Sequence, residues 1–193
     1  KIYNVYIKDS DQISLFLSLL IDLIYGELPK VYRDSSHYGQ WDDFDGYSGL
    51  KAFPKEVSEQ EIQEYYYMSQ DTIFSPHCQI YMRAQYDEET FHAEMERLKN
   101  IKVQGKNQEE NSILMDKKSF RTQAFVCEYA WSDCYEYALV FDETNTVVYI
   151  YLQNIEQKDI KFDEKFLPCE YGEENDSYCI YGFGIGKNVM YYN

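Results

Sequence analysis

The polar and apolar positions along the chain predict a helix near its start. The most apolar run, ISLFLSLLIDLIY (13–25), carries Ser14, Ser18 and Asp22 at intervals of four residues. These residues therefore form one narrow polar stripe on an otherwise apolar helix. At 1.5 Å per residue the run spans about 20 Å, which is too short for a bilayer core of roughly 30 Å. We expect a buried core helix over 10–25 and no transmembrane segment in this chain.

A second helical pattern occupies DEETFHAEMERLKN (87–100). Phe91, Met95 and Leu98 follow one another at helical spacing, so they share one face. Asp87 is a suitable residue to cap the start, where acidic side chains favour the positive end of the helix dipole. The pattern predicts an amphipathic helix that packs on a sheet.

Strand patterns account for most of the remaining chain. Aromatic and β-branched residues alternate in short runs separated by turn residues, which is typical of antiparallel strands. Residues 102–119 show no periodicity and predict an exposed connection. The predicted strands are IQEYYYM (62–68) and CQIYMRAQY (78–86), then a meander of AFVCEYAW (124–131), YEYALVF (135–141) and TVVYIYLQ (146–153), and an edge strand SYCIYGFGI (177–185).

These elements predict an α+β fold with a mainly antiparallel sheet, a buried N-terminal helix and one amphipathic helix on the sheet. The 193 residues are enough for one domain, 1–193, which can bury roughly 70 % of its unfolded surface without disulfides or metals. Within it we expect the helix at 10–25, a polar loop at 30–52 and the sheet region at 53–193.

Composition and charge narrow the possible partners. The chain has 34 acidic and 18 basic residues, a formal charge of −16, and 21 tyrosines. Such a charge repels nucleic-acid phosphates and anionic lipid, because both are bound through Lys and Arg. Tyrosine combines an apolar body with a polar tip and suits interfaces. The expected partners are another protein or a surface glycan, and not nucleic acid.

The cysteines and the first residue bear on location. Five cysteines cannot all pair within one chain, and an odd count favours reduced thiols and a cytoplasmic location. If residues 131–134 form a tight turn, Cys127 lies opposite Ala138, which excludes a Cys127–Cys134 pair. The chain starts at Lys1 without a methionine, so removal of an upstream segment is the alternative, and that would fit a membrane-anchored or exported protein.

Candidate chemistry concentrates in the loop RDSSHYGQWDDFDGYSG (33–49). Its residue types suit ligand or partner contacts, with His37, Trp41, Asp43 and Asp45 as the candidates. An aspartate beside His37 would orient an imidazole for acid/base work, yet no nucleophile lies nearby in sequence, so no catalytic residue is assigned. The alternative is a polar connection whose aspartates satisfy Arg33 and the backbone while its aromatic residues cover the core.

A metal-binding reading of the same loop rests on its aspartates. Asp42, Asp43 and Asp45 precede Gly46, as in a calcium loop. If that glycine takes the invariant sixth position, the first ligand position is Trp41 and the twelfth is Ala52, so two carboxylates are missing. An irregular calcium site is the remaining form of this alternative, and we expect no cofactor.

Five stretches of the chain together resemble an uncharacterised group of proteins from Gram-positive, gut-type Firmicutes. The resemblance covers most of residues 26–171 and implies a bacterial source. It implies no activity, cofactor or site residue. Some members have a hydrophobic N-terminal segment, which would fit a removed segment before Lys1. The stretches are GELPKVYRDSSHYG (26–39), FPKEV (53–57), DEETFHAEMERLKN (87–100), EYALVFDETNTVVYIYLQ (136–153) and FLPCEY (166–171).

Three functions remain as hypotheses. The favoured one is a non-catalytic binding protein that uses a Tyr-rich sheet face and an acidic surface. The second is an immunity-type protein that neutralises a basic toxin, which the charge of −16 motivates. The third is a metal-dependent hydrolase that uses the loop over 34–45. The sequence favours a protein that is not an enzyme.

Overall fold

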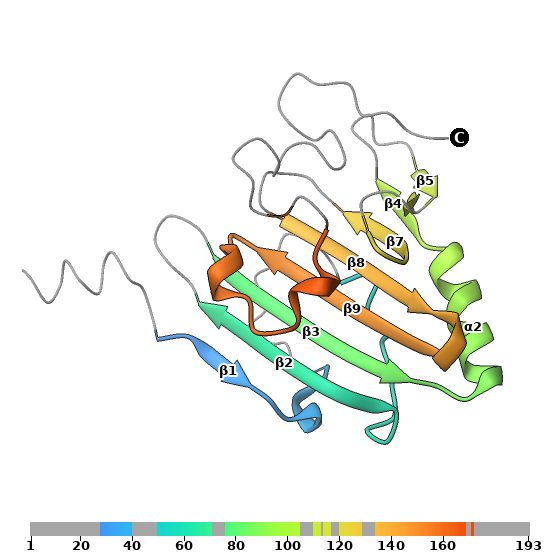
Figure 1. Ribbon diagram of the computed structural model, residues 1–193, viewed down its shortest axis with the longest axis horizontal. Coiled ribbons are helices and arrows are strands. Elements are labelled where there is room, and N and C mark those ends of the chain that lie inside the picture. Colours follow the sequence, from blue (N-terminus) through green and yellow to red (C-terminus); the bar gives the residue numbers. More distant parts are fainter. Residues whose placement is uncertain are drawn as a thin grey trace, which may run out of the picture.

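A seven-stranded antiparallel sheet dominates the computed structural model, which describes residues 28–39, 50–70, 76–104, 110–112, 114–116, 120–128, 134–168 and 171 (Figure 1). A separate pair of strands, β4 (Lys102–Gln104) and β5 (Glu110–Ser112), follows helix α2 (Glu88–Lys99). The sheet order is β1 (Lys30–Tyr32), β2 (Ile62–Gln70), β3 (His77–Gln85), β9 (Thr146–Gln153), β8 (Cys134–Phe141), β7 (Gln123–Glu128) and β6 (Leu114–Asp116).

The long central strands have the pairings that their patterns predict. β2 and β3 pair antiparallel, with Tyr66 directly opposite Tyr81. β8 and β9 also pair antiparallel, joined by the 3-10 turn η2 (Asp142–Thr144) and by Asn145, whose φ of 48° is left-handed. Asparagine tolerates that conformation better than most residues. β9 also pairs antiparallel with β3 and so joins the β2–β3 pair to the β8–β9 pair.

One face of the sheet is covered by α2 and by residues 50–54. Phe91, Met95 and Leu98 are buried against strand residues that include Tyr149, as the predicted stripe requires. The Asp87 side chain accepts a hydrogen bond of 2.8 Å from the Thr90 amide and caps the helix. The prediction of an amphipathic helix on an antiparallel sheet is therefore confirmed.

The opposite face is covered by the segment after β9, residues 155–168, which crosses in front of β9, β3 and β2 in Figure 1. Two short 3-10 turns, η3 (Gln157–Asp159) and η4 (Glu164–Phe166), shape this segment. Gln79 is fully buried beneath it: its side chain donates to the Asp159 carbonyl at 3.2 Å and accepts from the Lys161 amide at 2.6 Å. The central strands β3, β9 and β8 are thus largely buried on both faces.

Two details of the chain differ from the sequence-based expectation. The predicted connection over 102–119 contains β4, β5 and β6, because backbone pairing needs no side-chain period. Phe125, not Cys127, lies opposite Ala138, so the register differs from the one that a tight turn at 131–134 would set. β7 also has a register shift between Val126 and Glu128.

The predicted N-terminal helix at 10–25 and the predicted strand at 177–185 lie outside the described residues. Among the residues that are described, no helix has the length and apolarity needed to cross a membrane.

Candidate functional site

The described part of the candidate loop forms a short turn after β1. Residues Ser35–His37 make the 3-10 helix η1, and the Asp34 carboxylate accepts a hydrogen bond of 2.9 Å from the Ser36 amide. Hydrogen bonds from the Ser36 backbone and hydroxyl lower the pKa of the Asp34 carboxyl. This carboxylate therefore serves the loop backbone, as the polar-connection alternative requires.

His37 belongs to an aromatic stack. Its ring lies 4.3 Å from that of Tyr32 with an angle of 9° between the planes, and Tyr32 in turn stacks on Tyr67 at 5.6 Å. Its Nδ1 is 3.3 Å from the Ser36 hydroxyl. These contacts fix the loop against the sheet rather than orienting the imidazole for proton transfer.

The other loop candidates, Trp41, Asp42, Asp43 and Asp45, lie outside the described residues. Within the described ranges, no group of three His, Cys, Asp or Glu side chains is arranged to hold a metal ion. Tyr38 packs on the core as expected, and its hydroxyl donates to the Pro54 carbonyl at 2.5 Å.

Two further histidines, His92 on helix α2 and His77 in β3, are described by the structure. His92 is exposed on α2, as its place on the helix flank indicates. Cys78 is buried in the core on the α2 side, while its neighbour His77 is half-buried. Adjacent strand residues point to opposite faces, so these two side chains do not form a nucleophile–base pair.

A pocket of about 530 Å³ opens where β1 ends. There the first half of β2 pairs with β3 on one edge and has no neighbour among the described strands on the other. β1 pairs only with Tyr67–Ser69, and the chain then turns away at Arg33. The lining comes from residues 33–35, from 62–66 of β2, from Tyr81 of β3, and from Lys161 and Phe162 of the covering segment.

Packed aromatic rings form the floor of this pocket. The Tyr81 ring stacks on Phe162 with centroids 5.0 Å apart and 12° between the planes. The Arg33 guanidinium lies over the Tyr66 ring, 5.0 Å from its centroid. Burial raises the pKa of both tyrosines, although the Arg33 charge opposes the shift at Tyr66 and a hydrogen bond to Glu64 adds to the one at Tyr81. Both phenols are therefore neutral hydrogen-bonding groups near neutral pH.

The charged groups of the lining differ in how far they are already paired. The Glu64 carboxylate accepts from the Tyr81 hydroxyl at 2.8 Å and pairs with Arg83 at 3.1 Å. Neither Arg33 nor Lys161 forms an ion pair with any residue that the structure describes. The pocket therefore has two cations with capacity for an external anion.

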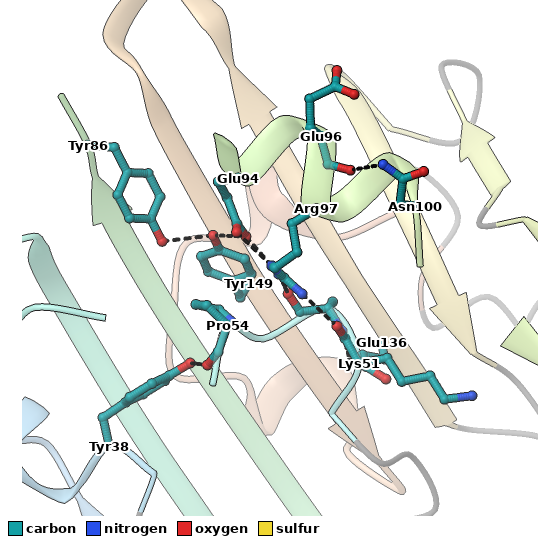
Figure 2. A network of polar contacts seen from close by, with 11 residues as sticks. Tyr38, Lys51, Pro54, Tyr86, Glu94, Glu96, Arg97, Asn100, Glu136 and Tyr149 are labelled. Atoms are coloured by element: carbon teal, nitrogen blue, oxygen red, sulfur yellow. Dashed lines mark hydrogen bonds and ion pairs between the residues drawn. The ribbon is translucent and has the colours of Figure 1, made fainter. Parts of the chain in front are cut away.

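A second polar cluster lies between α2 and the sheet, away from this pocket (Figure 2). The Glu94 carboxylate accepts a 2.6 Å hydrogen bond from the Tyr149 hydroxyl and pairs with Arg97 at 2.6 and 2.7 Å. The Tyr86 and Tyr149 hydroxyls are 2.8 Å apart. Burial, with the nearby Tyr86 and Glu94, raises the pKa of Tyr149 well above its usual range. This phenol is a hydrogen-bond donor to Glu94 and not a base.

Arg97 also fastens the segment that passes beneath α2. Its guanidinium donates to the Lys51 carbonyl at 3.1 Å and to the Ala52 carbonyl (Figure 2). Glu136, which is fully buried, accepts from the Ala52 amide at 2.5 Å. Burial alone would lower the pKa of Arg97, but the hydrogen bonds and charge of Glu94 outweigh it and raise the pKa. None of these residues lines the pocket, so we assign the cluster a structural role.

The sequence contains signals for the pocket and for the polar cluster beneath α2, but its hydrophobic periodicity points to neither. The alternation of 62–68 and 78–86 places Tyr66 and Tyr81 in strands that pair, but their register depends on the hairpin geometry. The spacing of Glu94 and Arg97 is that of a helical ion pair, yet nothing local indicates that the pair is buried. Arg33 and Lys161 are far apart in sequence and meet only through the fold.

Comparison of the chain with known protein families, with curated proteins and with solved structures found no match. The resemblance to uncharacterised Gram-positive proteins therefore stays a prediction, and the function has to be argued from the geometry.

Proposed function

We propose that this protein is a non-catalytic binding protein, and that its ligand occupies the pocket between the end of β1 and residues 161–162. The observation that carries the proposal is the pocket itself. Its volume of about 530 Å³ lies within the range of small-ligand sites, roughly 300–1,000 Å³. A pocket of that size accommodates a glycan unit or a short part of a protein partner.

The lining favours recognition over chemistry. Tyr66 presents a hydroxyl that has no hydrogen-bond partner among the described residues. Gln63, three positions earlier on β2, is exposed, and its amide nitrogen donates to the Gln60 and Glu61 carbonyls at 3.4 Å. Phenol and amide groups both donate and accept, so they select a ligand by its hydrogen-bonding pattern. The tyrosines of the central strands are buried on both faces of the sheet, so among the described tyrosines of β2 and β3 those at the pocket are the ones placed to meet a ligand.

Filling the pocket tests the proposal without assuming a ligand class. Gln63→Trp places a large side chain in the lining from an exposed strand position, where an aromatic residue is tolerated. Glu59→Trp adds the same ring at an exposed turn position outside the lining. Both variants and the parent chain are screened by saturation-transfer NMR against neutral and acidic oligosaccharides and peptides.

We expect the parent and the Glu59→Trp chain to bind the same probe, and the Gln63→Trp chain to lose it. The bound probe should be recovered chemically unchanged after prolonged incubation. Equal binding by the Gln63→Trp chain would contradict the pocket, and cleavage of the probe would contradict a non-catalytic function.

A specific observation favours one second candidate, an immunity-type protein that binds a basic toxin. Exposed acidic residues from α2 and η2 meet at one end of the sheet, where the Tyr86 amide donates to the Asn145 carbonyl at 3.0 Å. Neither 86–90 nor 141–146 contains a Lys or Arg. Such a surface would accelerate association with a cationic partner. The acidic residues are Asp87, Glu88, Glu89, Asp142 and Glu143.

Stopped-flow mixing with purified basic toxin domains tests this candidate. We expect an association rate that falls steeply with salt and falls further in the Glu88→Lys, Glu143→Lys double variant. A rate that neither salt nor the charge reversal changes would argue against it.

The metal-dependent hydrolase that uses residues 34–45 is the third candidate and stays a prediction. A metal that binds the folded chain raises its melting temperature. An unchanged midpoint at millimolar calcium or transition metal would count against it.

A further inference from the structure

We propose that the ligand of the pocket is an acidic saccharide, whose carboxylate is held by Arg33 and Lys161. This inference names the ligand class of the proposed binding function and rests on it. It begins from the charges of the lining, where the two cations Arg33 and Lys161 balance the carboxylates of Asp34 and Glu64, although the chain as a whole carries −16. Neither cation forms an ion pair with a residue that the structure describes, whereas Glu64 pairs with Arg83.

Both carboxylates of the lining are already committed to other donors. Asp34 accepts the Ser36 amide at 2.9 Å and caps η1. Glu64 accepts the Tyr81 hydroxyl and pairs with Arg83. The pairing with Arg83 offsets the charge of Glu64, so an incoming anion meets two cations and one carboxylate, Asp34, that is directed at the η1 backbone.

Arg33 is held in a defined position by its surroundings. Its guanidinium lies over the Tyr66 ring, and the residues on either side of it in sequence are fixed: Tyr32 stacks between His37 and Tyr67, while Asp34 caps η1. A guanidinium that stacks by its flat face keeps its N–H groups, which lie in the plane, for a carboxylate. Such a pairing can be bidentate.

Lys161 is fixed from the other side of the pocket. Its backbone amide donates to the fully buried Gln79 side chain at 2.6 Å, and the next residue, Phe162, stacks on Tyr81. The two cations are therefore carried by segments that are each anchored to the sheet, about 130 residues apart in the chain. This anchoring lowers the ordering cost of binding, because the backbone at each cation is set before the ligand arrives.

The remaining lining favours a saccharide over a peptide. The Ser35 and Tyr66 hydroxyls donate and accept, and the Gln63 side-chain oxygen accepts, which suits the many hydroxyls of a sugar. Phe162 offers a partly exposed apolar surface to the sugar ring. An extended peptide would instead add a strand along β2. The register shift between Ile62 and Glu64 disturbs the regular pairing of β2 with β3 beside the pocket, and such bulges disfavour strand addition.

Isothermal titration with two matched trisaccharides tests the inference. One carries hexuronate units and the other is its neutral hexose counterpart, both at 0.15 M salt, where the Debye length of about 8 Å screens distant carboxylates. We expect the acidic trisaccharide to bind at least about tenfold more tightly, since a charge-assisted contact contributes that much. Arg33→Gln and Lys161→Gln should each remove most of this preference, so that the two sugars bind with nearly equal affinity.

Lys158→Gln is the matched control, because it removes the same charge three residues from Lys161 but from a side chain that pairs with Glu156 outside the lining. It should retain the preference. If the two sugars bind equally tightly and Gln63→Trp blocks both, the acidic-saccharide inference is overturned while the proposed binding function is retained. Tighter binding of a hexaglutamate peptide would overturn the saccharide class. Binding of every probe unaffected by Gln63→Trp would overturn both proposals.

Discussion

Replacing Arg97 with methionine tests the structural role assigned to the cluster beneath α2. The substitution keeps an apolar stem of similar length but removes the donors to Glu94 and to the Lys51 and Ala52 carbonyls. The Glu94 side chain is only 8 % exposed, so it would be left as a poorly compensated buried carboxylate, with the Tyr149 hydroxyl as its remaining donor among the hydrogen bonds described here.

The expected loss follows from burial. Removing one partner of a fully buried ion pair costs about 3–5 kcal/mol, and the 34 % exposure of the Arg97 side chain reduces this to about 2–3 kcal/mol. For a chain of this size that corresponds to a fall in melting temperature of roughly 4–12 °C. Urea denaturation followed by circular dichroism measures the free energy of unfolding directly.

Lys99→Met supplies the control on the same helix. Lys99 pairs with Glu96 at 2.8 Å with the same spacing, but both side chains are more than half exposed, so its removal should cost less than about 1 kcal/mol. Adding Glu94→Gln to Arg97→Met should cost less than the two single losses summed, by about 1–2 kcal/mol. Equal effects of Arg97→Met and Lys99→Met, with no coupling to Glu94, would refute the assigned role.

Three further predictions concern the core and the pocket wall. Leu98→Ala should lower the free energy of unfolding by about 2–5 kcal/mol, whereas His92→Ala, at an exposed position, should leave the urea midpoint unchanged. Gln79→Leu should cost about 1–3 kcal/mol in the same assay and weaken trisaccharide binding, because it releases the segment that carries Lys161. Burial raises the pKa of Tyr137 and Tyr149 in the folded chain, so the unfolded chain loses these protons first. The stability that these two tyrosines contribute is then fully present below about pH 10 and is lost as the pH rises further. Tyrosinate absorbance at 295 nm should appear together with unfolding. Ionisation that clearly precedes unfolding would contradict this prediction.

The sequence predicted those parts of the fold that local periodicity determines. The stripe of Phe91, Met95 and Leu98 predicts both the helix and its buried face, and the alternation in 62–68 and 146–153 predicts strands. Ser58 and Glu61 also have the spacing of a capping box, and the Glu61 carboxylate accepts the Ser58 amide at 2.9 Å. Short-range physics is sufficient for each of these features.

The features that sequence reasoning missed depend on long-range contacts. β4, β5 and β6 are held by backbone pairing and have no side-chain period that would reveal them. The pocket forms where the turn at Arg33, the paired strands β2 and β3 and the covering segment at 161–162 come together in the fold. The interpretation of the 33–39 loop as a polar connection agrees with the cap at Asp34, but Arg33 lies over Tyr66 instead of pairing with an aspartate of the described loop.

The pocket as the ligand site is tested most directly by mapping a bound ligand on the chain. Amide and tyrosine-ring NMR shifts are followed while the hexuronate trisaccharide is added to the parent chain and to Gln63→Trp. Binding at the pocket predicts saturable shifts at 33–35, 62–66 and 161–162 that are absent in the variant. Shifts at the acidic end of the sheet, 87–89 and 142–144, that persist in the variant would contradict it.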